Sequence, residues 1–313
     1  MNKLPQPNGP LYLADGGLET TLIFLDGIEL PAFSAIEMVS SEEKKLHLSA
    51  YFKPYFELAA KHGTGFVLES PTWRSSHGWA EEIGRTEAEL EQLSREAVQL
   101  MHQLRKDNQS NVQNVIVSGC IGPRGDGYVV DQKMTADEAQ AYHGKQISLF
   151  VDEAVDCVSA LTMTYAEEAI GIARAAKALG VPSIISFTVE TDGCLVTGQT
   201  LEAVIKEVDE QTGGAPAYYM INCAHPSHFV DKLVGQGDWL NRIGGIRANA
   251  SRCSHEELDN AEELDIGNPV ELAEEYAALL DCLPNLMVLG GCCGTDLRHI
   301  TAIANQISVS KAA

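Results

Sequence analysis

Two adjacent cysteines, Cys292 and Cys293, lie near the end of the sequence in the stretch GGCCGTDLRHI. Successive side chains of an extended strand point to opposite faces, so both thiols can serve one centre only where the strand becomes irregular. The glycines on either side of the pair allow that irregularity. A third thiol, Cys223, ends an earlier apolar stretch that continues as INCAHP. Thiols that meet from neighbouring strand ends could hold one metal ion.

Three cysteine ligands with an open fourth position are typical of a catalytic zinc site, because a structural site is usually closed by four protein ligands. Zinc holds a bound thiol as its thiolate, and the thiolate is the nucleophile that attacks an electrophilic methyl group. A lone cysteine such as Cys223 is more often a packing residue. The adjacent pair could also form a vicinal disulfide or a redox switch. The three residues together favour a metal site, and the chemistry that they indicate is alkyl transfer to sulfur.

Eight apolar or β-branched stretches alternate with eight segments of helical periodicity. The predicted strands begin at residues 11, 65, 114, 157, 183, 217, 242 and 286. The predicted helices cover 40–62, 86–105, 135–155, 166–179, 200–211, 226–235, 269–280 and 296–306. Thr86 with Glu89, and Thr135 with Glu138, have the spacing of capping boxes. Gly180 and Pro182 predict the end of one helix.

Eight strand–helix alternations favour a closed (β/α)8 TIM barrel over an open α/β sheet. Neither an internal repeat nor a Ser/Gly-rich linker divides the chain, so residues 1–313 are expected to form one domain. The active site of such a barrel lies at the carboxyl ends of its strands. Cys223 ends the sixth predicted strand and the cysteine pair ends the eighth, so the three thiols should converge there.

The composition is that of a globular protein with a strong excess of acidic residues. The formal net charge is −22, which disfavours nucleic acid and anionic membranes as partners. The N-terminus has no apolar signal segment, and no apolar run is long enough to cross a membrane. We therefore expect a cytoplasmic protein. In that compartment the eight cysteines are expected to be core residues, metal ligands or catalytic groups rather than a disulfide framework.

INCAHP followed by GGCCGTDLRHI resembles the zinc signature of the homocysteine S-methyltransferase family. The stretches LADGGLETTL, SGCIGPRGDGY and VPSIISFTVETDGCLVTGQT also resemble the opening strand and loop, the third-strand segment and the fifth-strand region of that family. Together these matches run from residue 14 to residue 300, almost the whole chain.

The resemblance implies a TIM barrel enzyme in which Cys223, Cys292 and Cys293 bind Zn²⁺ and homocysteine is methylated to methionine. A related small thiol is the other acceptor considered. Methyl donors differ within the family, and the absence of folate and cobalamin modules here favours a sulfonium such as S-methylmethionine or S-adenosylmethionine. The expected partners are thus the thiol and its methyl donor, and the sequence leaves a homo-oligomer open.

The resemblance also suggests substrate-binding residues. Asp15 matches an aspartate expected beside the ammonium group of the acceptor, where a carboxylate would pair with the positive charge. Its other interpretation is a turn residue after the first strand. Asn222 precedes the first cysteine ligand, and its amide could orient the metal site. Asn249 is the one residue that remains of the tyrosine–proline–asparagine run found after the seventh strand in the family.

This chain departs from the family around the expected metal site. Leu161 replaces a glutamate that helps to bind the homocysteine amine, and an unpaired buried ammonium is costly. The stretches RANAS and ESPTW likewise replace family patterns after the seventh and second strands. Three residues could supply the missing carboxylate, namely Glu69, Glu190 and Asp192. Arg247 could instead suit an acceptor that carries a carboxylate.

These departures keep a second hypothesis open. A diverged barrel could retain the thiol cluster as a metal or redox sensor after losing the amino-acid site, and Leu161 is the residue that best supports this view.

Overall fold

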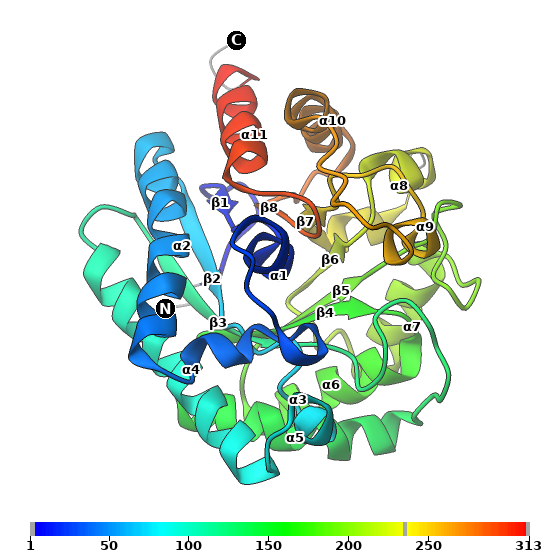
Figure 1. The fold of residues 1–313 in the computed structure, drawn as a ribbon. Helices are drawn as coiled ribbons and strands as arrows, with labels where there is room; N and C mark the ends of the chain where they lie inside the picture. The colour runs from blue at the N-terminus through cyan, green and yellow to red at the C-terminus, as the bar shows by residue number, and fades with distance from the viewer. Residues whose placement is uncertain (1–3, 234–236, 311–313) are drawn as a thin grey trace.

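The computed structural model describes residues 4–233 and 237–310, with side chains as far as residue 308. Eight parallel strands follow one another in chain order and close into a barrel (Figure 1). The closure is direct, because Tyr12 of the first strand pairs with Gly65 on one side and with Val288 on the other. The strands are β1 (Tyr12–Leu13), β2 (Gly65–Glu69), β3 (Val115–Ile121), β4 (Cys157–Met163), β5 (Ser183–Phe187), β6 (Tyr218–Asn222), β7 (Ile243–Ala248) and β8 (Val288–Gly291). The predicted (β/α)8 barrel and its eight strands are confirmed.

A ring of helices surrounds the barrel (Figure 1). They are α2 (Glu42–His62), α4 (Glu87–Asn108), α5 (Ala136–Asp152), α6 (Ala166–Leu179), α7 (Leu201–Thr212), α8 (Pro226–Leu233), α10 (Pro269–Cys282) and α11 (Leu297–Ser310). Each corresponds to a predicted helix, with ends that differ by a few residues. The predicted end of one helix at Gly235 lies outside the described residues.

The helix ends follow from side-chain capping. Thr86 and Thr135 each accept a hydrogen bond from the backbone amide three residues later, and the glutamate at that position bonds back to the cap, so both predicted capping boxes are confirmed. Gly180 ends α6 with φ of 73°, a left-handed conformation that glycine adopts without steric cost.

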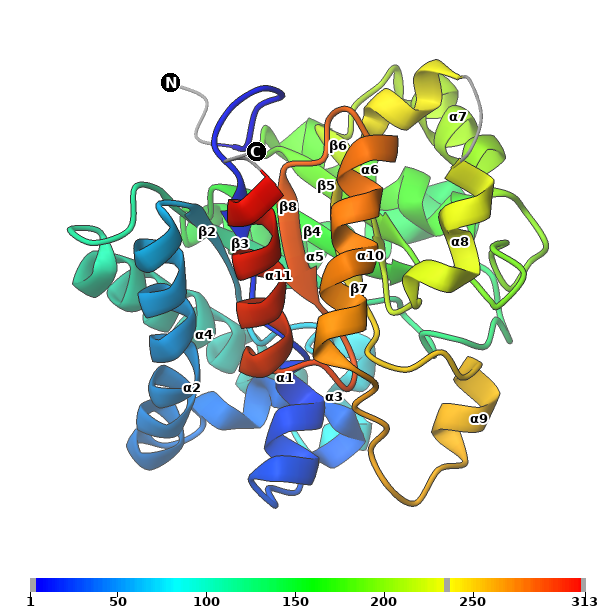
Figure 2. The same ribbon diagram turned by 90° about the horizontal axis from the view of Figure 1, so that it is seen from above.

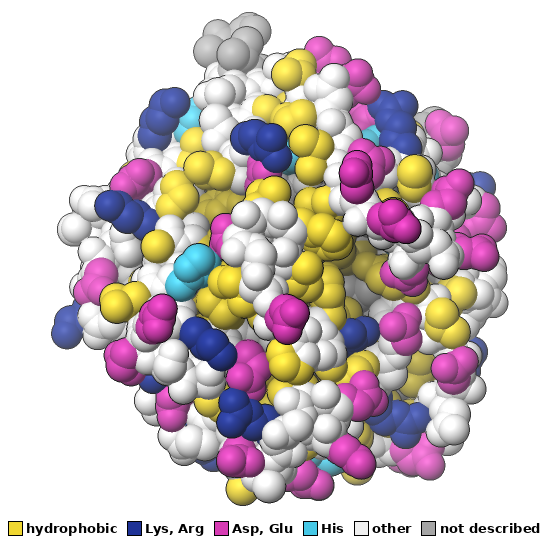
Figure 3. Space-filling view, in the orientation of Figure 1, with side chains coloured by type: hydrophobic (Ala, Val, Ile, Leu, Met, Phe, Trp, Pro, Cys, Tyr) yellow, Lys and Arg dark blue, Asp and Glu magenta, His cyan; other side chains and the backbone are white. Residues whose placement is uncertain are grey.

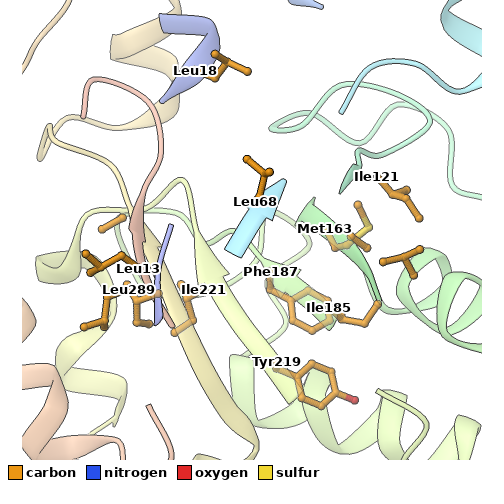
Figure 4. Packing of buried hydrophobic residues seen from close by; sticks show 14 of the residues in the cluster. Leu13, Leu18, Leu68, Ile121, Met163, Ile185, Phe187, Tyr219, Ile221 and Leu289 are labelled. Carbon is orange, nitrogen blue, oxygen red and sulfur yellow. The ribbon is translucent and has the colours of Figure 1, made fainter. Parts of the chain in front are cut away.

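The strands bury both faces, as expected of a parallel barrel. One face packs against the helices, and Figure 4 shows Leu68, Ile185 and Phe187 among the buried side chains of this layer. The other face fills the barrel near the amino ends of the strands with a smaller apolar cluster that includes Ile116 and Met220. Above this cluster the inward positions become polar, which leaves room for a site at the carboxyl ends of the strands.

Most of the additional short elements, which were not predicted, lie at this end of the barrel, whereas the 3₁₀ turn at Asp238–Arg242 lies at the other end, directly before β7. The additional elements are α1 (Leu18–Thr20), α3 (Ala80–Ile83), α9 (His255–Asp259), a π-helical turn at Thr21–Leu25 and 3₁₀ turns at Pro31–Phe33, Ala35–Val39, His77–Trp79 and Asp238–Arg242. Figure 2 shows α1, α3 and α9 together at the lower end of the barrel. The loops that carry these three helices therefore shape the mouth of the site. None of the helices in the described ranges combines the length and apolar character needed to cross a bilayer.

Candidate active site

A cavity of about 530 Å³ opens at the carboxyl ends of the strands. Residues from β2, β3, β4, β6, β7 and β8 line it, together with the loops after β1, β2, β3, β6, β7 and β8. Figure 3 shows hydrophobic side chains around a hollow near the middle of this face, with acidic side chains at its edge. This is the position where a TIM barrel carries its active site.

The cavity contains the three cysteines singled out from the sequence. The Sγ atoms of Cys223, Cys292 and Cys293 all lie within 4.8 Å of one another. Cys223 and Cys292 are joined by a disulfide bond, with their Cα atoms 5.3 Å apart, and Cys293 keeps its thiol. A disulfide between the adjacent residues 292 and 293 was one alternative to the metal site in the sequence analysis, whereas the disulfide in the structure joins residues from two strand ends. The predicted convergence of the three sulfur atoms is confirmed.

Cys223 has a backbone conformation that is unusual for a residue with a side chain, with φ of 53°. Three donors converge on its carbonyl oxygen. His255 Nε2 donates over 2.6 Å, Asn249 Nδ2 over 3.1 Å and Thr188 Oγ1 over 3.4 Å. Because strain of this kind persists only where the surroundings enforce it, these bonds explain how the Cys223 side chain is held toward the other two thiols.

Asn222 connects the cysteine cluster to two neighbouring strands. Its Oδ1 accepts hydrogen bonds from the Thr162 amide (2.9 Å) and the Ser186 hydroxyl (2.6 Å). Its Nδ2 donates to Thr162 Oγ1 (2.8 Å) and lies 3.9 Å from Cys292 Sγ. The amide is thus held by β4 and β5 while it faces a sulfur atom, which is the geometry of a group that orients a metal site.

Tyr128 and His255 form a second support that sequence reasoning missed. Their rings stack 4.1 Å apart, and the Tyr128 hydroxyl lies 3.8 Å from Cys293 Sγ. His255 is the first residue of α9, and Ser254 and Glu257 form a capping box there. That Ser–x–x–Glu spacing was a readable signal for a helix start, but no local pattern indicates that the helix reaches the cysteines.

The three cysteine sulfur atoms fit the ligand set of a catalytic zinc site. Tetrahedral Zn–S bonds of about 2.3 Å place neighbouring sulfur atoms about 3.8 Å apart, which is compatible with the observed cluster once the disulfide is reduced. Burial raises the pKa of the Cys293 thiol to about 11, even though the Tyr128 hydrogen bond lowers it. A cation beside the sulfur would counter this effect by stabilising the thiolate.

Asp15, the residue expected to meet an ammonium group, already has a buried partner. Arg247 Nη2 lies 2.6 Å from Asp15 Oδ1, and both side chains are more than nine-tenths buried. The Arg247 Nε also donates to the Gly291 carbonyl over 3.1 Å. The pair therefore spans the end of β8 directly before the cysteines.

The departures seen in the sequence meet at this cavity. Leu161 lines its wall as an apolar side chain. Of the three proposed substitutes for the missing carboxylate, Glu69 lines the cavity, whereas Glu190 pairs with His255 Nδ1 over 3.0 Å. Asp192 accepts a hydrogen bond from the Cys194 amide within its own loop.

The cavity wall carries mostly acidic charge. The lining contains two arginines, Arg74 and Arg247, and a larger number of acidic residues. The acidic residues are Asp15, Glu19, Glu69, Asp126, Asp259, Glu263 and Asp265. Burial raises the pKa of Glu19 to about 7 and also raises that of Glu69. A positively charged ligand would relieve the repulsion among these groups.

A protein-family model described as Homocysteine S-methyltransferase matches residues 12–307. The chain belongs to this family. Membership in the homocysteine S-methyltransferase family makes the protein an enzyme that transfers a methyl group to sulfur. Comparison with curated protein sequences finds no relative with significant similarity.

Solved structures of the homocysteine methyltransferase MmuM from Escherichia coli share the fold. Its metallated and oxidized forms each align with a TM-score of 0.73 and 18% identity over 95% of this chain and 96% of that chain. Its apo form aligns over the same shares with a TM-score of 0.64. The relative thus exists in a metal-bound form.

Proposed function

We propose that this protein is a zinc-dependent S-methyltransferase that methylates homocysteine, or a related small thiol, with a sulfonium methyl donor. The observation that carries the proposal is the meeting of the Cys223, Cys292 and Cys293 sulfur atoms on one cavity wall. The three residues are the proposed zinc ligands. When bound, zinc supplies a positive charge that lets the acceptor thiol react as a thiolate near neutral pH.

The reaction balances with the thiol and a sulfonium alone. The acceptor thiol releases its proton to the solvent, its sulfur forms a new bond to the methyl carbon, and the bond between that carbon and the donor sulfur breaks. The electron pair of the broken bond stays on the donor, which leaves as a neutral thioether. The role of this chain is to place the two sulfur atoms in line and to exclude water from the cavity.

The acidic wall supports a cationic donor. A sulfonium carries a fixed positive charge, which acidic side chains such as Asp126 and Asp259 would attract toward the cavity. Aromatic side chains on the same wall, Phe24 and Tyr128 among them, can contact the cation through their ring faces.

Asn222 and Asn249 support the metal centre in this proposal. Asn222 faces Cys292 Sγ, and Asn249 donates to the Cys223 carbonyl. Both amides therefore position ligands, and their removal is expected to lower metal affinity about 10- to 100-fold. A reducing compartment such as the cytoplasm would keep the three cysteines available as thiols.

The test is a direct assay. Reduced protein loaded with stoichiometric zinc is incubated with homocysteine and S-methylmethionine or S-adenosylmethionine, and mass spectrometry follows methylated product. Formation of methionine supports the proposal. Failure to methylate any small thiol with either donor, in protein verified to contain zinc, contradicts it.

The disulfide between Cys223 and Cys292 favours a second candidate, a barrel that senses redox state or metal without methylating homocysteine. X-ray absorption at the zinc edge separates the two functions. A methyltransferase should show a new sulfur ligand when homocysteine is added, whereas a sensor that excludes the thiol should show an unchanged spectrum.

A further inference from the structure

The floor of the cavity contains two buried polar atoms that make no hydrogen bond. One belongs to a guanidinium group and the other to a carboxyl group. Within the described residues, Arg247 Nη1 and Glu69 Oε2 both lack a hydrogen-bond partner. Arg247 and Glu69 are each 7% exposed, and both line the same cavity as the cysteines. An unused donor and an unused acceptor at one buried place are costly unless something pairs with them.

The Arg247 guanidinium is fixed in one orientation. Its Nε and Nη2 are bound to Gly291 O and Asp15 Oδ1, so the group cannot turn to satisfy Nη1 without breaking these bonds. Although burial lowers the pKa of Arg247, the charges of Asp15 and Glu69 raise it overall, and the group stays cationic. Nη1 therefore offers a charged donor to the cavity from the end of β7.

Glu69 faces the floor from the end of β2. Burial raises the pKa of its carboxyl, whereas the charge of Arg247 and hydrogen bonds from Ser118 and Ser159 lower it. The two hydroxyl oxygens lie 2.7 Å apart, so one serine donates to the other and the remaining proton is the one available to the Glu69 carboxyl. The side chain is thus held in place with one oxygen unpaired.

We propose that Arg247 and Glu69 form a clamp for the α-amino-acid end of the thiol acceptor, with Arg247 Nη1 binding its carboxylate and Glu69 Oε2 binding its ammonium group. A zwitterion is the ligand that satisfies both atoms at once. This inference rests on the proposed function, because the sulfur of the same acceptor must reach the cysteine cluster on the wall above.

The clamp explains two features of the site together. Asp15 is bound to Arg247, so its contribution is to hold the guanidinium, which makes it a positioning residue. Leu161 lines the cavity with an apolar side chain, so an ammonium group needs a carboxylate from elsewhere. Glu69 supplies one from a different strand, and the acceptor keeps both charged contacts.

The first experiment measures kcat/KM of zinc-loaded protein for three thiols that share the spacing from sulfur to the α-carbon of homocysteine. They are L-homocysteine, 4-mercaptobutanoate, which lacks the amino group, and 3-mercaptopropylamine, which lacks the carboxylate. Loss of one charge-assisted contact is expected to reduce kcat/KM roughly 10- to 100-fold for each truncated thiol. Equal kcat/KM values for all three thiols would overturn the clamp.

Two substitutions assign the contacts to their residues. Glu69→Gln keeps the shape of the side chain and should lower kcat/KM for homocysteine while leaving that for 4-mercaptobutanoate unchanged. Arg247→Lys removes the planar fork and should lower kcat/KM for both carboxylate-bearing thiols while sparing 3-mercaptopropylamine. Glu202→Gln, at an exposed glutamate of α7, is the matched control and should change none of the values.

Binding of L-methionine, measured by isothermal titration calorimetry, gives a readout that needs no turnover. Wild-type protein should bind methionine, and Glu69→Gln should bind it roughly 10- to 100-fold more weakly. If the wild type binds methionine but methylates no thiol, the proposed function fails and the clamp stands. If homocysteine is methylated while Glu69→Gln changes neither binding nor thiol preference, the clamp fails and the proposed function stands.

Discussion

Arg247 and Asp15 form a buried ion pair across the carboxyl end of β8, with Arg247 Nη2 2.6 Å from Asp15 Oδ1. The pair connects β7 to the loop after β1 and passes directly before the cysteine pair. This contact and the bond from Arg247 Nε to Gly291 O together fix the guanidinium at the cavity floor, and the ion pair joins the strand ends on either side of β8.

Breaking this pair should destabilise the fold. Asp15→Ala leaves the Arg247 charge buried without its partner, and we expect the free energy of unfolding to fall by about 3 kcal/mol. Urea denaturation of wild type and variant at neutral pH measures the difference. A loss below about 0.5 kcal/mol would mean that water already screens the pair.

Removing one proposed zinc ligand should remove the metal. Cys292→Ala leaves two thiols in the cluster, and we expect loss of both stoichiometric zinc and methyl transfer, measured by elemental analysis and product formation. Cys253→Ser, at an exposed cysteine outside the cluster, is the control and should retain both. Full zinc retention by the Cys292 variant would contradict the assignment of the three ligands.

His255 should contribute through the backbone of Cys223. His255→Ala removes the 2.6 Å hydrogen bond to the Cys223 carbonyl and the ring that stacks on Tyr128. We expect a loss of stability of roughly 1–3 kcal/mol and weaker zinc binding, measured by thermal denaturation and by competition with a chromophoric chelator. Wild-type zinc affinity in a folded variant would show that the strained Cys223 conformation does not depend on this bond.

Glu19 should make stability fall as pH rises. Burial raises the pKa of Glu19 from 4.5 to about 7, so the folded protein keeps a proton that the unfolded chain releases. This contribution is complete below about pH 4.5 and is lost as the pH rises through about 7, and its size is at most about 3 kcal/mol.

The variant Glu19→Gln tests this dependence, because glutamine has no proton to lose. Between about pH 5 and about pH 8, the free energy of unfolding should fall less for the variant than for the wild type. Parallel curves for the two proteins would rule out a contribution from Glu19.

The barrel could be predicted from the sequence because its signals are local. Each strand is a short apolar run, and each helix has its own periodicity and caps, such as Thr86 with Glu89. The short helices at the mouth were missed because they span only one or two turns. The helix α9, for example, contains five residues, too few for a periodic pattern to be recognised.

The cysteine cluster was accessible from sequence for a different reason. Parallel strands of a barrel all end at one rim, so residues that close β6 and β8 must lie near each other whatever the details of packing. That argument places Cys223 near Cys292 but does not say which bonds form. The disulfide pairing and the φ of Cys223 depend on atoms from several loops.

The amino-acid order therefore specified the barrel, its rim and the three thiols at that rim, because each depends on neighbours in the chain or on the topology alone. Tertiary packing decided which charges face one another across the barrel. It pairs Asp15 with Arg247 and places His255 against the Cys223 carbonyl. It also leaves Glu69 Oε2 and Arg247 Nη1 without hydrogen-bond partners among the described residues. Such contacts join residues that are far apart in sequence, and their distances are set only when all eight strands close.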